Sequence, residues 1–266
     1  MTRDLTRLLE WLRPHAAGGV ALAYSGGVDS AVLLAALAEL RRETSFPCLA
    51  LTLRTPLQRQ AETDEARALA ERLGVPWRLV EADPLAAPAV SANAPDRCYA
   101  CKRLMMARLR EAAAGFALLI DGSNADDRRA PNRPGLRALD ELGVRSPLAA
   151  LGLPKPAVRD LARALALPDP DRPATPCLAT RFPYGTPLTE ARLRRVEAAE
   201  ERLRALLPQT RDLRLRDHGD LARLEVPAAD FPRVLERREA LLAALRPLGY
   251  RFVTLDLAAF RSGSFD

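Results

Sequence analysis

Residues 24–30 read Tyr-Ser-Gly-Gly-Val-Asp-Ser, and this stretch decides the fold expected for the chain. The apolar run Val20–Ala23 leads into it, and the helix-like run Ala31–Leu37 follows it. A strand that turns through two glycines into a helix leaves unpaired backbone N–H groups at the helix start, where the positive end of the helix dipole also lies. Such a turn binds anions and is well suited to phosphate.

The residue types in this loop fit a phosphate that arrives with a metal ion. Gly26 and Gly27 can take a positive φ and let a phosphate approach the backbone, while Ser25 and Ser30 add hydroxyl donors. Asp29 would repel a bare phosphate, so we expect it to bind a Mg²⁺ ion that the nucleotide carries.

The spacing of the glycines excludes two other phosphate loops. The chain contains neither Gly-x4-Gly-Lys-Ser/Thr nor Gly-x-Gly-x-x-Gly, so it has no Walker loop and no dinucleotide fingerprint. Residues Ser25–Ser30 instead resemble the PP-loop, Ser-Gly-Gly-x-Asp-Ser, of enzymes that split ATP into AMP and pyrophosphate. The alternative is an ordinary strand–turn–helix with small residues in its turn. The resemblance implies ATP and Mg²⁺ as cofactors.

Strand-like and helical runs alternate through the first part of the chain. The strand-like runs are Val20–Tyr24, Cys48–Leu53, Trp77–Val80 and Ala117–Ile120, and the helical runs between them are Ala31–Arg41, Thr63–Leu73 and Lys102–Ala113. This alternation predicts the α/β class, with a parallel sheet covered by helices on both faces. The PP-loop resemblance adds the adenine nucleotide alpha hydrolase-like fold. Ligands of such sheets bind beyond the carboxyl ends of the strands, where the glycine loop lies.

A different pattern follows the proline-rich stretch Pro168–Pro187. After another helix at Val158–Leu165, the expected elements are a helix (Thr189–Leu207), two strands (Leu213–Arg216 and Leu221–Val226), a helix (Phe231–Leu245) and a strand (Arg251–Leu255). We therefore expect a PP-loop domain at residues 1–185 and a small α+β domain at residues 186–266, for substrate binding or oligomerisation.

Composition limits the partners of the chain. Its 266 residues carry a net charge of +6, but Lys102 and Lys155 are the only lysines among 40 basic residues, so 38 are Arg. The arginines alternate with carboxylates, as in Glu190–Glu197, and only 5% of residues are aromatic. This pattern indicates solvated helix faces and no nucleic-acid partner. Without a long apolar stretch or a signal-peptide core we also expect no membrane partner and a cytoplasmic location.

Three of the four cysteines lie outside apolar strands. Cys98 and Cys101 form a Cys-x-x-Cys pair at a helix start, and Cys177 lies in a distant loop, whereas Cys48 sits in an apolar strand and reads as a small buried hydrophobe. The pair alone fits a redox couple, half of a zinc site or part of an iron–sulfur site. Neither histidine has metal-like spacing to the cysteines. Three thiolates without an obvious fourth ligand fit a cluster with one open iron, and three unrelated thiols are the alternative.

Later motifs extend the resemblance to a specific family. These motifs are Arg133-Pro134-Gly135-Leu136, Arg181-Phe182-Pro183-Tyr184-Gly185-Thr186, Val253-Thr254-Leu255-Asp256-Leu257 and Phe260-Arg261-Ser262-Gly263. With Ser25–Ser30, they make the chain similar, almost end to end, to the LarE family. That family comprises the pyridinium-3,5-biscarboxylic acid mononucleotide sulfurtransferases of nickel-pincer cofactor synthesis.

The LarE resemblance implies a reaction and a sulfur site. The substrate would be the biscarboxylated mononucleotide, of which one carboxylate is adenylated and becomes a thiocarboxylate. In the family, the position of Cys177 carries the transferred sulfur, and some members sacrifice the sulfur of that cysteine. This chain resembles the three-cysteine type, in which Cys98, Cys101 and Cys177 would ligate a 4Fe-4S cluster that holds an extra sulfide. The resemblance also implies a homo-oligomer, and the immediate sulfur donor stays open.

Individual side chains receive roles mainly from these resemblances. Lys155 resembles the lysine of a Lys-x-x-Val-Arg element and is expected to contact departing pyrophosphate; the alternative is a surface lysine. A carboxylate of Asp121 or Asp126 would assist the metal or nucleotide, unless this segment is a solvated Asx turn. The remaining candidates match family positions for phosphate or substrate contacts or near the active site: Arg181, Arg214, Arg216 and Glu200. Each of these also fits an ordinary surface charge.

Two further functions remain open at this point. A tRNA thiolase combines a PP-loop with a Cys-x-x-Cys pair and another cysteine, but would be expected to carry an RNA-binding module, and none is recognisable in the sequence. A non-enzymatic scaffold that binds nucleotide and metal would bind ATP without releasing pyrophosphate.

Overall fold

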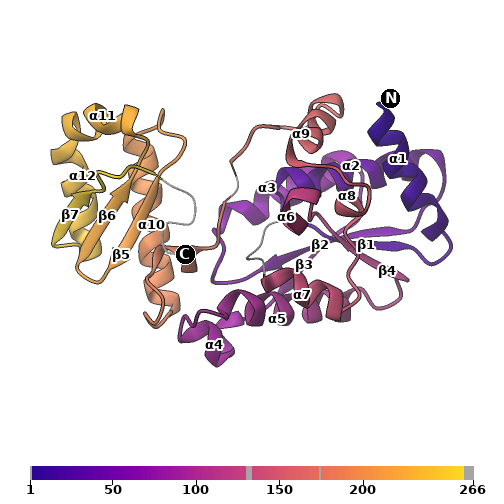
Figure 1. Cartoon of the computed structure of the whole chain (residues 1–266), viewed down its shortest axis with the longest axis horizontal. Helices are drawn as coiled ribbons and strands as arrows, with labels where there is room; N and C mark the ends of the chain where they lie inside the picture. The colour runs from indigo at the N-terminus through magenta and orange to yellow at the C-terminus, as the bar shows by residue number, and fades with distance from the viewer. Residues whose placement is uncertain (1, 130–133, 174, 261–266) are drawn as a thin grey trace. The chain divides into compact units, whose positions relative to one another are not determined.

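The computed structural model describes residues 2–129, 134–173 and 175–260, and contacts divide the chain into two compact units (Figure 1). The first unit is built from Met1–Thr55, Gln60–Pro84 and Asp96–Ala174. The second is built from Pro56–Arg59, Leu85–Pro95 and Thr175–Asp266. The domain division predicted at residue 185 remains a prediction, since these units are defined by contacts alone.

A four-stranded parallel sheet forms the centre of the first unit. Its strands are β1 (Val20–Ala23), β2 (Cys48–Arg54), β3 (Trp77–Glu81) and β4 (Leu118–Asp121), in the order β3-β2-β1-β4. All three neighbouring pairs are parallel, with Val20 aligned on Cys48 and on Leu118. All four predicted strands are therefore present. β1, β2 and β4 are apolar runs that the sheet buries on both faces, whereas β3 alternates buried or half-buried residues with the exposed Arg78 and Glu81.

Helices cover both faces of this sheet, as the alternation of elements predicted (Figure 1). Val20 and Leu22 of β1 belong to a core with residues of five helices, whereas Ala21 between them belongs to a core with residues of α5 and α7. The first set of helices is α1 (Arg3–Leu12), α2 (Val28–Glu43), α3 (Ala61–Leu73), α8 (Pro147–Ala150) and α9 (Lys155–Ala164). The opposite set is α5 (Arg97–Ala112) and α7 (Pro134–Glu141).

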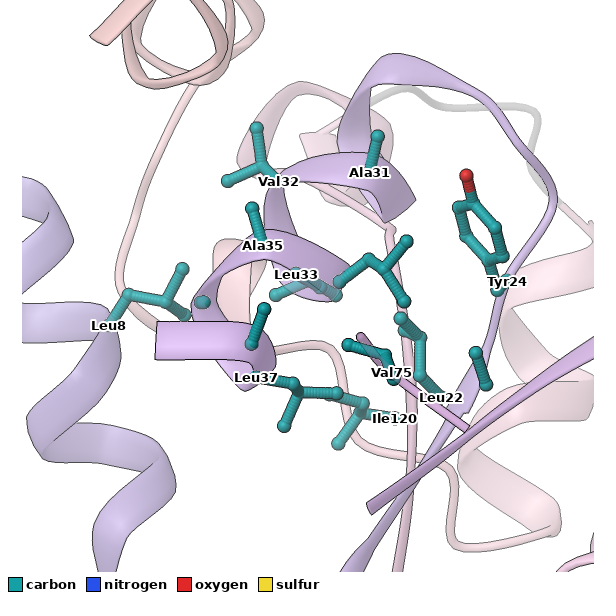
Figure 2. Close-up of a cluster of buried hydrophobic side chains, with 14 of the residues drawn as sticks. Leu8, Leu22, Tyr24, Ala31, Val32, Leu33, Ala35, Leu37, Val75 and Ile120 are labelled. Atoms are coloured by element: carbon teal, nitrogen blue, oxygen red, sulfur yellow. The ribbon is translucent and has the colours of Figure 1, made fainter. Parts of the chain in front are cut away.

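The larger core fixes α2 above β1. Figure 2 shows Leu33 and Leu37 of α2 beside Leu22 and Ile120 of the sheet. These four side chains are fully buried. Helix α2 is apolar around most of its circumference, which suits a helix enclosed by the sheet on one side and by α1, α3 and α9 on others. The glycine loop at its start therefore has a rigid support.

The strand order places two loops side by side. The chain runs outward from β1 through β2 to β3 and then returns to β4 on the other side of β1. The loops that follow β1 and β4 consequently emerge next to each other, at the position where ligands of such sheets bind. A short extended segment at Arg145 pairs with Ile120 of β4 and adds its residues to the same edge. The short helices α6 (Ala125–Arg129) and α8 (Pro147–Ala150) complete this edge.

The second unit contains the predicted α+β elements. They are α10 (Glu190–Leu206), β5 (Arg214–His218), β6 (Leu221–Glu225), α11 (Phe231–Glu236), α12 (Arg238–Leu245) and β7 (Phe252–Leu255). Strands β5 and β6 form an antiparallel hairpin, and β7 adds to β6 in parallel. The single helix predicted at 231–245 is wrong in one respect, because the backbone leaves the α region at Arg237 and divides it.

Two segments from the first half of the sequence belong to this second unit, which the sequence did not predict. Leu57 O accepts a hydrogen bond from Leu178 N at 2.8 Å, and Ser91 O accepts one from Leu188 N at 2.7 Å. Asn93 is fully buried at φ +54°, and its Nδ2 donates to Pro183 O at 2.8 Å. These contacts pair residues about 90 or more positions apart, beyond the reach of local sequence patterns.

The remaining short elements connect the main ones. They are α4 (Pro88–Ser91) and the 3₁₀ turns Arg13–His15, Pro84–Ala86, Leu178–Arg181, Ala228–Asp230 and Arg246–Leu248. Within the described ranges, none of the helices has the length and apolarity that crossing a membrane requires.

Candidate functional site

The glycine loop after β1 is closed by its two serines. Ser30 Oγ donates to Gly27 O at 3.0 Å, and Ser25 Oγ lies 3.1 Å from Ser30 Oγ. Ser25 N also donates to Ser30 Oγ at 3.3 Å. The hydroxyls predicted as phosphate donors thus hold the loop in shape.

The start of α2 presents backbone N–H groups as predicted. Gly27 is the N-cap residue in an extended conformation, and no side chain caps the helix. Gly26 lies at φ +78°, a conformation that favours glycine. An uncapped N-terminus in front of a buried helix is an anion site, because its N–H groups and the helix dipole both favour negative charge.

Asp29 connects this loop with two other segments. Its Oδ2 accepts a hydrogen bond from Lys155 Nζ at 2.6 Å, and its Oδ1 accepts one from Asn124 Nδ2 at 3.4 Å. Lys155 is the first residue of α9, and its backbone N–H donates to Asp126 Oδ2 at 2.8 Å. The three predicted residues Asp29, Asp126 and Lys155 therefore meet, together with Asn124, at the carboxyl edge of the sheet. Asn124 was not singled out in advance, although it lies in the polar segment that follows β4.

Asp121 is a buried carboxylate at the end of β4. Ser146 Oγ donates to its Oδ1 at 2.6 Å, Ser123 Oγ donates to its Oδ2 at 2.7 Å, and Lys102 Nζ lies 3.8 Å from Oδ2. Its predicted role toward metal or nucleotide stays a prediction. Ser146 and Lys102 come from distant parts of the sequence, and no local pattern marked them as neighbours of Asp121.

Gly122 lets the loop after β4 approach α2. A Cβ atom placed there would lie 2.8 Å from Ser30 N and 3.2 Å from Asp29 C. Both are backbone atoms of the helix start and cannot rotate away, so a side chain at residue 122 would push the two loops apart. This requirement was not predicted, since Gly122 lies outside any recognised glycine motif.

The predicted cysteine ligands are divided between the two units. Cys98 is exposed and Cys101 half-buried in the first two turns of α5, three positions apart and so on the same side of the helix. Cys177 is half-buried and belongs to the second unit. Neither unit by itself contains all three. Among the described residues, no group of three or more His, Cys, Asp and Glu side chains is arranged to hold a metal ion.

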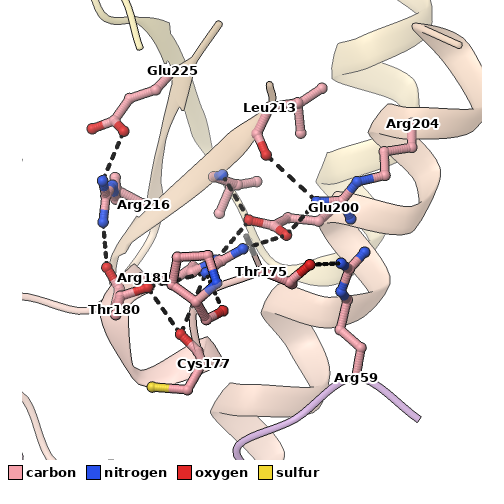
Figure 3. A network of polar contacts seen from close by, with 12 residues as sticks. Arg59, Thr175, Cys177, Thr180, Arg181, Glu200, Arg204, Leu213, Arg216 and Glu225 are labelled. Atoms are coloured by element: carbon pink, nitrogen blue, oxygen red, sulfur yellow. Dashed lines mark hydrogen bonds and ion pairs between the residues drawn. The ribbon is translucent and has the colours of Figure 1, made fainter. Parts of the chain in front are cut away.

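Arg181 and Glu200 form a buried pair behind Cys177 (Figure 3). Two guanidinium nitrogens of Arg181 donate to the two carboxylate oxygens of Glu200, at 2.8 and 3.0 Å. The third nitrogen donates to Pro176 O at 2.9 Å and to Cys177 O at 3.3 Å. The two side chains, predicted to lie at the active site, are thus engaged with each other. Arg181 also bonds the backbone that carries Cys177, whose sulfur points away from the pair in Figure 3.

Burial and charge act in opposite directions on Glu200. Burial favours the neutral acid, but the guanidinium groups of Arg181 and Arg204 outweigh it and hold the pKa of Glu200 below its usual value. Arg204 Nη2 contributes a hydrogen bond of 2.8 Å. The carboxylate therefore stays ionised inside the unit.

A second buried pair lies on the adjoining strands. Arg216 of β5 donates to Glu225 of β6 at 2.8 Å and to Thr180 O, which ties the strand to the turn after Cys177. Arg223 also donates to Glu225, at 3.1 Å. Arg216 was predicted to contact phosphate or substrate. In this structure its side chain is fully buried within the unit.

Arg214 differs from the other buried arginines. The residue is 7% exposed, and its guanidinium carbon lies 4.6 Å from the centroid of the Phe260 ring. Among the described residues it makes neither a hydrogen bond through its side chain nor an ion pair. Burial, followed by the nearby charges of Arg181 and Arg216, lowers the pKa of Arg214. A buried guanidinium without a carboxylate partner is the donor that an anionic ligand needs.

Several residues of the motifs singled out from the sequence lie outside the described residues. They are Arg133, Arg261, Ser262 and Gly263. Of the same motifs, Gly135 and Leu136 lie in the first turn of α7, and Phe260 contacts Arg214.

Comparison with known proteins places this arrangement in a family. A PP-loop domain family matches residues 1–128. The pyridinium-3,5-bisthiocarboxylic acid mononucleotide synthase of Lactiplantibacillus plantarum is 38% identical over 247 residues, which cover 92% of this chain and 87% of that protein. The chain belongs to the LarE family.

Two other relatives differ in how much of their length the match covers. An uncharacterised protein of Synechocystis is 36% identical over 92% of this chain and 91% of its own length. The tRNA(Ile)-lysidine synthase of Pseudomonas aeruginosa is 33% identical, over 57% of this chain and 35% of its own length. Family membership confirms the predicted fold class and the prediction of a PP-loop enzyme that uses ATP for sulfur transfer.

Proposed function

We propose that this LarE-family enzyme converts a carboxylate of pyridinium-3,5-biscarboxylic acid mononucleotide into a thiocarboxylate, as a step toward a nickel-pincer nucleotide cofactor. The observation that carries the proposal is the uncapped start of α2, which the Asp29–Lys155 pair flanks at the carboxyl edge of the sheet. The similarity to the Lactiplantibacillus plantarum synthase supports the choice of substrate.

Activation by ATP answers a chemical difficulty. A carboxylate is anionic and has no good leaving group, so sulfur cannot displace its oxygen directly. In the proposed first step, a carboxylate oxygen attacks the α-phosphorus of ATP, the bond to pyrophosphate breaks, and an acyl-adenylate forms. In the second, a sulfide attacks the acyl carbon, AMP leaves with the electron pair of its C–O bond, and the thiol proton is lost to give the thiocarboxylate.

The residues at the edge of the sheet would act mainly by positioning and by charge neutralisation. The N–H groups at the start of α2 would bind phosphate oxygens, and Lys155 would contact the departing pyrophosphate. Asp29 fits a Mg²⁺ ion bound to ATP, because its carboxylate is part-exposed and its second oxygen has only a long hydrogen bond from Asn124.

The residues around Cys177 would hold the second half of the reaction. Arg181 binds the carbonyl oxygens of Pro176 and Cys177, so its role is to position the loop that carries the thiol. Arg214 would bind an anionic group of the mononucleotide, because its buried guanidinium lacks a carboxylate partner among the described residues. We assign Glu200 and Arg216 the same structural task, which is to keep Arg181 and the turn after Cys177 in place.

The thiols suit an iron–sulfur centre by their chemistry. Cys98, Cys101 and Cys177 would hold a 4Fe-4S cluster, which supplies an iron that can bind the sulfide to be transferred. Cys98 and Cys177 each follow a point at which the chain passes from one unit to the other, after Pro95 and after Ala174. A cytoplasmic location, where thiols stay reduced, and a homo-oligomer complete the proposal.

The decisive experiment is anaerobic purification followed by incubation with ATP, Mg²⁺, sulfide and the biscarboxylated mononucleotide. We expect AMP, pyrophosphate and the thiocarboxylate in equal amounts, measured by liquid chromatography and mass spectrometry. A parallel reaction with unmodified tRNA tests the thiolase alternative. Thiolated tRNA without thiocarboxylate would refute the proposal.

The cluster needs a separate test. Cys98→Ala should abolish the broad iron–sulfur absorbance of the anaerobically reconstituted protein. Cys48→Ala is the matched control, because Cys48 is buried in β2 and its thiol pKa is raised by burial, so it should keep the full spectrum. An unchanged spectrum in Cys98→Ala would argue against the three-cysteine centre.

A further inference from the structure

Both lysines of this arginine-rich chain lie at the same edge of the first sheet. Lys155 Nζ contacts Asp29, which follows β1. Lys102 Nζ lies 3.8 Å from Asp121 Oδ2, at the end of the neighbouring strand β4. The proposed reaction assigns a task to Lys155 and none to Lys102.

Lys102 has hydrogen-bond donors to spare. Its distance from Asp121 is too long for a hydrogen bond, and Asp121 is already bonded to Ser123 and Ser146. Among the described residues, Lys102 Nζ donates no hydrogen bond. The side chain is 30% exposed, so a ligand can reach it. Asp121 therefore directs the ammonium group toward this edge, while the N–H donors of Lys102 stay available for another anion.

Helix α7 supports the lysine from the side. A Cβ atom at Gly135 would lie 3.5 Å from both Cβ and Cγ of Lys102, so the backbone of α7 runs along the lysine stem. Tyr99 lies one turn before Lys102 on α5 and also contacts α7. The guanidinium of Arg137 lies 4.0 Å from its ring, and Tyr99 Oη donates to Glu141 at 2.7 Å. Both Arg137 and Glu141 belong to α7, which therefore fixes the first turns of α5.

The character of the two cations suits a phosphate that must be released. An ammonium is a compact point charge with three donors, whereas a guanidinium is a wide planar fork that binds an oxyanion through two bonds. The chain uses Arg at 38 of its 40 basic positions, and its two ammonium groups are the charges placed beside β1 and β4. Lys155 on the β1 side and Lys102 on the β4 side can neutralise the charge of a phosphate without enclosing it.

We propose that Lys102 binds the phosphate group that remains in AMP, from the β4 side of the site. The inference rests on the proposed function in that the nucleotide must bind at the start of α2. Lys102 directly follows Cys101, one of the proposed cysteine ligands, and the α-phosphate is the group that separates from the acyl carbon when sulfur attacks. Lys102 would thus stabilise the negative charge that AMP gains as it leaves.

Binding measurements with AMP and adenosine test this role directly. Lys102→Met should weaken the binding of AMP about tenfold, the effect of losing one charge-assisted hydrogen bond, and leave the binding of adenosine unchanged. Arg103→Met is the matched control, because Arg103 is the next residue on α5, is exposed and carries the same charge. It should bind both ligands like the unmodified chain.

A protection experiment on the unmodified protein avoids any question of folding. With only two lysines in the sequence, acylation of each ε-amine can be followed by peptide mass spectrometry. AMP should slow the acylation of Lys102 about tenfold, as expected for one bound phosphate, and adenosine should not. Equal reactivity of Lys102 with and without bound AMP, or equal AMP affinity in folded Lys102→Met, would overturn the inference. If the unmodified chain binds neither ATP nor AMP, the proposed function itself fails.

Discussion

The polar groups of the two units are held in different ways. In the first unit, the glycine loop is shaped by backbone atoms, two serine hydroxyls and the close approach of Gly122. Its charged side chains Asp29 and Lys155 are part-exposed. In the second unit, the turn after Cys177 is held by fully buried guanidinium–carboxylate pairs.

This difference is the one expected between side chains that bind a ligand, as we propose for Asp29 and Lys155, and side chains that hold the protein together. A nucleotide must enter and leave, so its charged partners have to be reachable by solvent. Burial costs an ion pair its hydration energy, and only good geometry between the two charges offsets that cost. Buried pairs are therefore poorly suited to bind a ligand, but breaking one destabilises the protein strongly. The arginines that the sequence marked as substrate contacts therefore divide into two classes. Arg181 and Arg216 hold the turn, whereas Arg214 has no carboxylate partner among the described residues, and we propose that it binds an anion.

The largest effect should come from removing a buried carboxylate of the second unit. Glu200→Ala leaves Arg181 and Arg204 without their shared partner, and should lower the free energy of unfolding of that unit by about 3–5 kcal/mol. Urea titration followed by circular dichroism measures this loss. Trp11 and Trp77 both belong to the first unit, so tryptophan fluorescence reports separately on it. Glu201→Ala, exposed and next in sequence, should change neither signal.

The same carboxylate predicts a dependence on pH. Since the native pKa of Glu200 is depressed, its contribution to stability is complete above the unfolded pKa of about 4.3 and is lost as the pH falls through the lower native pKa. The stability difference between the unmodified chain and Glu200→Gln should therefore be constant near neutrality and shrink below about pH 4. A difference that stayed constant down to pH 2 would show that ionisation of Glu200 is unimportant.

A smaller loss is expected from a glycine in the first unit. Gly122→Ala forces a Cβ against the backbone of Ser30, which should cost about 1–3 kcal/mol and weaken ATP binding together with it. Tryptophan fluorescence during urea unfolding measures the stability, and calorimetry measures the binding. Gly135→Ala is the control, because a Cβ there makes only ordinary contacts at 3.5 Å. Equal behaviour of the two variants would contradict the close approach of the two loops.

The smallest effect should follow from the loop serine. Ser30→Ala removes the hydroxyl that donates to Gly27 O and should cost about 0.5–1.5 kcal/mol in stability of the first unit. Exposed Ser45→Ala provides the comparison and should be neutral. If Ser30→Ala lost as much stability as Glu200→Ala, the contrast between the two units would not hold.

Much of the first unit could be predicted because its signals are local. The four strands are apolar runs, and the glycine turn marks the only phosphate loop that was recognised. Helix α1 was not predicted, although Leu5, Leu8, Leu9 and Leu12 recur at helical spacing and all are buried in the core. That signal was available. The inclusion of residues 85–95 in the second unit depends instead on contacts with residues far away in the sequence.

In the candidate site, too, some residues could be identified from local sequence patterns and others only from the fold. Motifs in the sequence identified the glycine loop, the cysteines and the family, because each is a short pattern with a chemical reason for its residue types. Their neighbours came only from the fold. The parallel sheet brings Asp121, Lys102 and Ser146 together from three separate segments.

The sequence by itself determined the sheet, the phosphate loop and the family, since apolar runs and glycine spacing act over a few residues. Tertiary structure alone decided which charged groups are buried against one another. An arginine looks the same in the sequence whether it faces solvent, a carboxylate or a ligand. Its partner is set by packing across the whole unit, which for Arg181 is Glu200.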